Sequence, residues 1–226
     1  GLVGYHAGRI VASSCSGAII GDSYVGGLVG VNRGDIETSQ ASGQINGLNT
    51  YTGGLVGRDF GRIAESHSAG SVNGVAHVGG LAGCNDRGDI VASHSTAATA
   101  GIGSYVGGLV GYNSGKITGS HSTGGIIGPD HVGGLVGCNS ESIARSHSHG
   151  TVNGDQLVGG LVGYNTGGGD IDASYSAGAV IGDSYVGGLA GRNDGRVTTS
   201  YSNAAVRGGK TVGGLIGYNI STLGGI

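Results

Sequence analysis

The sequence has few of the residues that fill an ordinary protein core. Of its 226 residues, one is Pro, one is Phe and none is Met or Trp, whereas 55 are Gly. Because large side chains are scarce, any packed interior has to be narrow and built from small residues. The glycine content does not predict a flexible linker, since hydrophobic residues make up 37% of the chain and recur at regular positions.

Other absences exclude whole classes of protein. There is no G-X-Y period, which excludes collagen. No apolar run approaches the roughly 18 residues that a membrane-spanning helix needs, so we expect no membrane span. Lys and Arg total 11 against 14 Asp and Glu, with no basic block, which argues against a nucleic-acid partner. The chain begins inside a repeat and without a signal-peptide pattern, so we expect a fragment of a longer protein.

What the sequence does contain is a repeat. A four-residue motif, GLVG with GLAG and GLIG variants, recurs at intervals of 26 to 28 residues. This interval is the length of one solenoid coil, and the extra residues fall in turns, where they leave the strands in register. The nine copies start at Gly1, Gly27, Gly54, Gly80, Gly108, Gly134, Gly160, Gly188 and Gly214.

Equivalent residues of the copies form columns, which a parallel stack would turn into ladders with about 4.8 Å between neighbours. Two columns consist almost entirely of β-branched residues, as suits stacked strands. The segment S-x-S-x-G-x-V alternates, which places Ser66, Ser68 and Val72 inside and His67 toward water. We therefore predict an all-β fold for residues 1–226: one domain, a single-stranded parallel β-solenoid (β-helix) of about eight complete rungs with about three short strands each.

Three further columns carry expectations. A column of Asn, usually followed by Gly, marks a repeated corner because both residues tolerate positive φ. A column running Arg9, Asp35, Arg62, Asp89, Lys116 alternates in sign, so opposite charges would lie on neighbouring strands. In V-G-G-L-V-G, strict alternation would separate Val25 from Leu28; we expect a glycine bulge that buries both, the alternative being an exposed Leu stripe under a partner.

These motifs resemble the GLUG repeat. The resemblance rests on the GLVG core, the following Asn and Gly, and the pattern I-x-x-S-x-S-x-G-x-V, and it covers essentially the whole chain. The family is known from bacterial surface and secreted proteins, including large adhesins and regions flanking immunoglobulin A metallopeptidases. The resemblance implies extracellular display and a solenoid, with no cofactor and no activity that can be transferred to particular residues. No H-E-x-x-H occurs, so the peptidase association does not carry over.

The most suggestive column for a ligand site holds four successive histidines, His67, His94, His121 and His147. Stacked imidazoles could bind Zn²⁺, Cu²⁺ or Ni²⁺, or repel one another once protonated near pH 6.5. An exposed aromatic ladder without metal is the favoured interpretation, because no carboxylate or thiolate is fixed beside them in sequence.

A second outward column precedes each V-G-G and is also rich in aromatic residues. Aromatic faces along a rigid rod can stack on sugar rings or pack against an identical rod, whereas a ladder that merely stiffens the stack is an equally good explanation. We treat this column as a possible ligand or self-association stripe, formed by Tyr24, Tyr51, His77, Tyr105, His131 and Tyr185.

The remaining reactive groups do not suggest an enzyme. Cys84 and Cys138 share a column two rungs apart, roughly 10 Å, which is too far for a disulfide, so these two and Cys15 are predicted to be free thiols. Acidic residues are dispersed, whereas glycosidases need two carboxylates at a defined separation. We expect an extracellular or cell-surface scaffold, a stalk, adhesin or filament subunit, that binds itself or a surface glycan or protein. An ice-binding solenoid and a carbohydrate-binding or carbohydrate-active β-helix are the alternatives.

Overall fold

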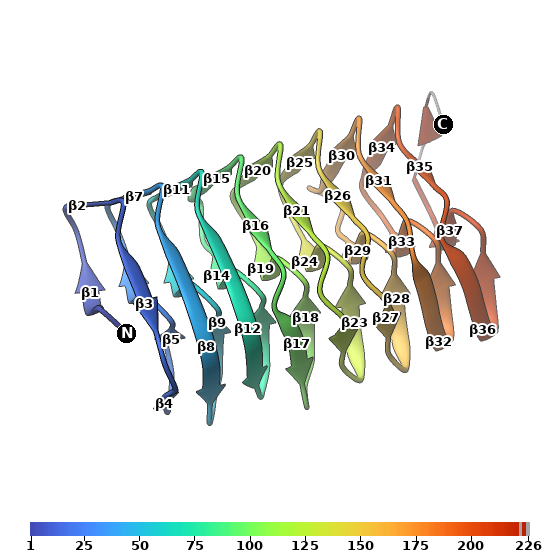
Figure 1. The fold of residues 1–226 in the computed structure, drawn as a ribbon. Helices are drawn as coiled ribbons and strands as arrows, with labels where there is room; N and C mark the ends of the chain where they lie inside the picture. The colour runs from blue at the N-terminus through green and yellow to red at the C-terminus, as the bar shows by residue number, and fades with distance from the viewer. Residues whose placement is uncertain (222, 225–226) are drawn as a thin grey trace.

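The protein is a parallel β-solenoid. The computed structural model describes residues 1–221 and 223–224, in which all regular secondary structure is β-strand. Three parallel sheets run the length of the molecule, and the chain passes through them about eight times (Figure 1). The predicted fold class is confirmed. No helix within the described ranges is long and apolar enough to cross a membrane.

Sheet A contains the strand that follows each GLVG turn. Its nine strands are β1 (Val3–His6), β6 (Val29–Asn32), β10 (Val56–Asp59), β14 (Ala82–Asn85), β19 (Val110–Asn113), β24 (Val136–Asn139), β29 (Val162–Asn165), β33 (Ala190–Asn193) and β37 (Ile216–Asn219).

Sheet B contains the short strand around each Ile of the first β-branched column. Its nine strands line one long edge of the view in Figure 1: β2 (Arg9–Val11), β7 (Asp35–Glu37), β11 (Arg62–Ala64), β15 (Asp89–Val91), β20 (Lys116–Thr118), β25 (Ser142–Ala144), β30 (Asp170–Asp172), β34 (Arg196–Thr198) and β38 (Leu223–Gly224).

Sheet C contains the rest of each rung and is divided into two or three strands per turn. The predicted three strands per rung therefore match the number of sheets, whereas each rung has four or five strands. Its twenty strands are β3 (Ser14–Ser16), β4 (Ile19–Gly21), β5 (Val25–Gly26), β8 (Gln40–Gly47), β9 (Thr50–Gly53), β12 (His67–Gly74), β13 (Ala76–Gly79), β16 (His94–Ser95), β17 (Ala98–Gly101), β18 (Ser104–Gly107), β21 (His121–Ser122), β22 (Ile126–Ile127), β23 (Asp130–Gly133), β26 (His147–Ser148), β27 (Val152–Asn153), β28 (Gln156–Gly159), β31 (Tyr175–Ser176), β32 (Ala179–Gly187), β35 (Tyr201–Ser202) and β36 (Ala205–Gly213).

The interior consists of two narrow apolar layers. One contains the Leu residues of the GLVG motif, the Val or Ala after each Leu, and the Ile column of sheet B. The other lies within the arm of sheet C and contains the Val25 and Ile45 columns. Leu28 is fully buried and Val25 is 5% exposed, so the expectation that both are inside is confirmed.

The glycine pair before each Leu makes this possible. The backbone N–H groups of Leu28 and Val29 both donate to the carbonyl of Leu55, at 2.9 and 3.0 Å, which breaks the alternation and turns both side chains inward. A Cβ on Gly27 would overlap the carbonyl of Gly54 in the next rung and lie 2.7 Å from Ala41. Position 27 therefore cannot hold a residue larger than glycine.

The two Ser columns lie inside, as predicted, and each has a separate role. The first column closes the corner between sheets B and C: Ser66 Oγ donates to the carbonyl of Ala64 at 2.7 Å and accepts from the N–H of Ser39 at 3.1 Å. The second crosses the interior, where Ser176 Oγ donates to the carbonyl of Gly188 at 2.6 Å. Both arrangements pair buried polar groups that would otherwise cost about 1–3 kcal/mol each.

The Asn column does form a corner, but the predicted cause is wrong. No Asn of the column has positive φ in the described chain; the positive values fall on other columns, such as Thr38 at 48° and Tyr24 at 55°. The Asn side chains from Asn32 to Asn193 instead point inward, are buried, and hydrogen-bond from rung to rung, as Asn113 does to Asn139 at 2.8 Å.

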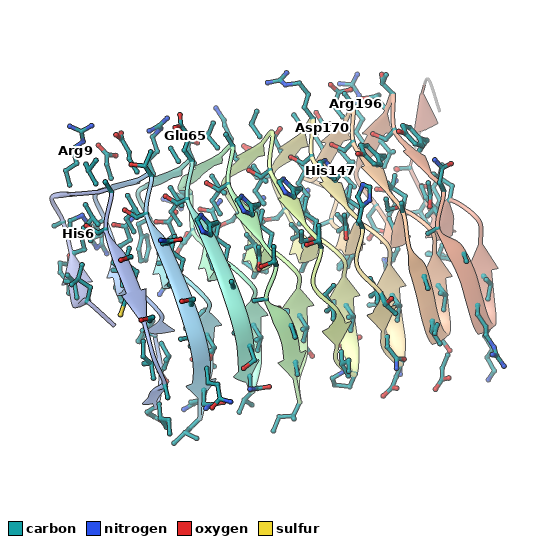
Figure 2. The ribbon with its side chains drawn as sticks, viewed as in Figure 1. His6, Arg9, Glu65, His147, Asp170 and Arg196 are labelled. Atoms are coloured by element: carbon teal, nitrogen blue, oxygen red, sulfur yellow. The ribbon has the colours of Figure 1, made fainter. Side chains whose placement is uncertain are left out.

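The charged column also needs correction. Its residues are in register, with Asp35 opposite both Arg9 and Arg62, but no two of its opposite charges form an ion pair within residues 1–221. Both arginines reach Glu37 instead, at 2.6 Å and 3.2 Å, because a long side chain spans the diagonal to a neighbouring strand. Charged side chains such as Arg9, Asp170 and Arg196 follow one edge in Figure 2.

Candidate functional site

The predicted stripe lies on the strand that completes each rung, just before the glycine pair. All residues of its column have a positive φ, between 52° and 69°. This conformation costs an ordinary residue about 1–2 kcal/mol, and here it accompanies a change of side: Tyr24 is exposed whereas Val25 is buried. Sequence alternation alone gave no sign of that strain.

Five of the six stripe residues form one continuous ladder. Ring centroids are 5.3 Å apart for Tyr24 and Tyr51, 4.8 Å for Tyr51 and His77, 4.9 Å for His77 and Tyr105, and 4.8 Å for Tyr105 and His131. Tyr24 and Tyr51 stack with an interplanar angle of 13°, and the other three pairs are tilted by 37°, 35° and 46°, so neighbouring rings cover much of each aromatic face and leave mainly ring edges accessible. The Nδ1 atoms of His77 and His131 are buried. A sugar ring would meet these edges rather than open aromatic faces, which are what the stacking hypothesis assumed.

Tyr185, the sixth stripe residue, is separated from this ladder. Leu157 occupies the position between His131 and Tyr185, and the Tyr185 ring instead contacts Tyr218 edge-on, with centroids 5.8 Å apart. The stripe is therefore an aromatic ladder over five rungs and a single aromatic pair near the C-terminal end.

Sheet A adds a flanking column that sequence reasoning missed. The outward residue of each V-G-x-N strand lies beside the stripe: Tyr112 packs edge-on against Tyr105 at 5.9 Å, and the Arg58 guanidinium lies 5.2 Å from the Tyr51 ring centre. Tyr164 and Arg192 occupy the same column four and five rungs after Arg58, and the Arg192 guanidinium lies 5.0 Å from the Tyr164 ring centre. The column mixes Tyr and Arg with Val31 and two Cys residues, so its only signal in the sequence is its constant place in the repeat.

The environment of the stripe shifts two of its titrating groups. Burial, and after it the charge of Arg58, lowers the pKa of His77. Burial, followed by the effect of neighbouring ionisable groups, raises the pKa of Tyr105. Both shifts favour neutral side chains, so the centre of the stripe presents uncharged hydrogen-bonding groups near neutral pH. The Nδ1 atom of His131 lies 2.7 Å from Asp130 Oδ2.

The histidine column forms a second and more regular ladder on another face. Successive rings from His67 to His147 are 4.9 Å apart, with interplanar angles of 6°, 3° and 2°. Tyr175 and Tyr201 extend the stack. The histidines point outward, as His147 does in Figure 2, but stacking leaves them half-buried rather than fully in water.

This geometry is poorly suited to chelation. Two imidazole nitrogens bound to one Zn²⁺ at about 2.1 Å can be no more than about 4.2 Å apart. Parallel rings spaced by 4.9 Å hold equivalent nitrogens farther apart and aim their lone pairs in parallel. No group of three or more His, Cys, Asp or Glu residues among those described is placed to hold a metal ion.

The same ladder responds to protonation. Burial is the main cause that lowers the pKa of His94, His121 and His147, and neighbouring histidines add to the effect. The stack therefore favours neutral imidazoles, because charges 4.9 Å apart in partly dehydrated rings repel.

The three cysteines are free thiols, as predicted. Cys84 and Cys138 lie on the flanking column of sheet A and are buried there, and Tyr112 lies between them in register. Burial raises the pKa of each of these two thiols to about 12, so both stay protonated and unreactive near neutral pH.

Comparison with known proteins agrees with the repeat. The family model of the GLUG motif matches residues 21–46, 102–127 and 154–181. No curated protein and no solved structure matches the chain. The three matched segments are copies of the unit that recurs through the stacked rungs, so these repeats are GLUG motifs, as the sequence resemblance predicted.

Proposed function

We propose that this protein is an extracellular structural and adhesive scaffold, a stalk, adhesin or filament subunit at a bacterial surface, with no catalytic activity of its own. The observation that carries the proposal is the continuous contact of equivalent side chains along one axis, which builds a stiff support with outward ladders. The known settings of the GLUG family support the extracellular location.

The surface proposed to bind is the stripe together with its flanking column. The Tyr and His rings and the Arg58 guanidinium lie side by side along five rungs. Such a row of hydrogen-bonding groups, backed by aromatic edges, suits the hydroxyl groups of a surface glycan or the same stripe of another copy. The ice-binding alternative required the S-x-S columns to face outward, and Ser66 and Ser68 are fully buried.

A matched pair of double variants tests this surface. Tyr24→Ser with Tyr51→Ser removes a stacked Tyr pair from the stripe, and Tyr175→Ser with Tyr201→Ser removes an equivalent pair, stacked at 5.1 Å, from the histidine ladder. Binding to a panel of immobilised oligosaccharides and self-association in sedimentation velocity are measured for both. We expect the first variant to lose at least about tenfold in affinity and the second to keep it. Equal behaviour of the two folded variants would contradict the proposal.

A further inference from the structure

The buried Asn column is a directional hydrogen-bond ladder. In each rung, the Asn side-chain amide uses one N–H for its own turn and the other for the next rung. Asn113 Nδ2, for example, donates to the carbonyl of Gly115 and to Asn139 Oδ1, both at 2.8 Å. The same pair of bonds recurs at Asn32, Asn85, Asn139, Asn165 and Asn193.

Asp59 interrupts this ladder with a group that has no N–H. It is completely buried and lies in register between Asn32 and Asn85. Its Oδ1 accepts from Asn32 Nδ2 at 2.7 Å and from the Gly61 N–H at 3.3 Å. Its Oδ2 stands where an Asn would carry its donor, and this oxygen has no hydrogen-bond partner.

The next rung has the matching defect. Asn85 Oδ1 is also buried and without a partner, although every later Asn of the ladder from Asn113 to Asn219 receives a bond from the rung before it. Asn113 Oδ1 also accepts a hydrogen bond from the N–H of Gly115 at 3.4 Å. The turn after Asn85 contains the extra residue Arg87, at φ 65°, and no such bond forms there.

Three acceptor oxygens converge at this place. A Cβ built on Gly88 would lie 2.6 Å from each of Asp59 Oδ2, Asn85 Oδ1 and the Gly61 carbonyl oxygen. With an ionised carboxylate, a full negative charge would face two other acceptors inside the protein, an arrangement that costs several kcal/mol in general.

We propose that Asp59 is a proton-binding site, in which a neutral carboxyl group donates from Oδ2 to Asn85 Oδ1 and completes the ladder. The proton is transferred from hydronium or a buffer acid in solvent: its bond to that donor breaks as an O–H bond forms on Asp59, and the donor leaves as water or the conjugate base. The third rung is thereby more stable in mild acid than in mild base.

The surrounding charges do not replace that proton. The charged residues around this corner are Arg33 after β6, Asp35 of β7, Arg58 of β10, Arg62 of β11, Asp86 and Arg87 after β14, and Asp89 of β15. Arg62 is engaged by Glu37, and Asp86 is engaged by Arg58. The pKa of Asp59 is raised from 3.8 to about 7, mainly by burial and slightly by the charge of Asp89, while the bonds from Asn32 and Gly61 oppose the rise.

The direction of the pH effect follows from this shift. Between pH 3.8 and about 7 the folded state holds a proton that the unfolded state has lost, so stability from Asp59 is complete below pH 3.8 and falls as pH rises through 7. The histidine ladder acts in the opposite direction, so only the difference between wild type and an Asp59 variant isolates the site.

Two measurements on the full chain test the proposal. In the first, the Cγ resonance of ¹³C-labelled Asp59 is followed against pH, and we expect it to titrate near neutral pH. In the second, urea unfolding of wild type and Asp59→Asn is compared at pH 5 and pH 8. The variant restores both missing donors, so the unfolding equilibrium constant of wild type relative to it should rise by about a hundredfold between these pH values.

Asp22→Asn is the matched control, since Asp22 is exposed, and we expect its ratio to stay constant between the two pH values. A Cγ titration midpoint below pH 5 would overturn the proposal. So would an Asp59→Asn ratio that is the same at pH 5 and pH 8, because the variant would then act through packing alone.

Discussion

At the scale of single residues, this protein is specified by small side chains whose positions are fixed by their neighbours. Ser176 donates a hydrogen bond across the interior to the carbonyl of Gly188. Only glycine fits at position 188, because the next rung lies directly against its backbone. The Asn residues complete the turns from inside. A narrow interior thus needs few large hydrophobic residues, which explains the composition.

Gly108 tests how tightly these positions are determined. A Cβ there would overlap the carbonyl of Gly134 and lie 2.9 Å from Ser122 Oγ, so Gly108→Ala should destabilise the protein by about 3 kcal/mol or more. Gly125→Ala is the control, because a Cβ at Gly125 has nothing within 4 Å and its φ is not positive. Urea unfolding should separate the two clearly; a loss below about 1 kcal/mol at Gly108 would mean that the rungs can move apart.

The position of a side chain, inside or outside, was predictable from the repeat, whereas the backbone conformation of a single residue was not. The Ser columns and the free cysteines follow from alternation and spacing. The left-handed conformation at Tyr24 does not, because Tyr has no preference for positive φ and is forced into it by the rung as a whole. Asp59 reads as one more polar turn residue until its burial and the unpaired Asn85 oxygen are known.

At the scale of elements, the strands act through ladders. Register was predictable, since an in-phase repeat leaves one pairing possible, and Ile36 does lie opposite Ile63. The partner of each charged side chain was not, because Arg is long enough to choose between a direct and a diagonal neighbour, and Glu37 takes both arginines. The flanking column of the stripe was not predictable from residue type, because it mixes Tyr, Arg, Val and Cys and becomes recognisable only where the fold places it beside the stripe.

The histidine ladder should make the protein sensitive to acid. Because the pKa values of His94, His121 and His147 are lowered in the folded state, stability is complete above the ordinary value of 6.5 and is lost as pH falls through the lowered values. His121→Tyr keeps a stacking ring, as Tyr175 does in the native ladder, and removes the central charge. Its Tm should fall less than that of wild type between pH 7.5 and pH 5, by roughly 2 °C after allowance for screening.

The reverse substitution is the control for this effect. Tyr175→His extends the run of histidines by one, so its Tm should fall more than that of wild type over the same pH range. Identical acid sensitivity in both variants and wild type would show that the stacked imidazoles carry no charge interaction that affects stability.

At the scale of the whole molecule, each rung contacts mainly the rungs before and after it, as the order of strands in all three sheets shows. Stability in such an array is close to a sum of rung terms and neighbour interfaces. The number of repeats can then change without loss of the fold, as long as the register of the strands is kept. Removing a whole repeat should cost little, whereas removing part of one should place every following side chain out of its column.

Deletion of residues 108–133 tests this directly. It removes one period of 26 residues and joins Gly107 to Gly134, which recreates V-G-G-L-V-G at the junction. We expect a folded protein with the far-ultraviolet circular dichroism of a β-solenoid and a Tm within a few degrees of wild type. Deletion of residues 108–120 removes half a period and should prevent folding beyond the junction. If both deletions unfold the chain, the rungs are not independent units, and the scaffold depends on contacts that reach farther than one neighbour.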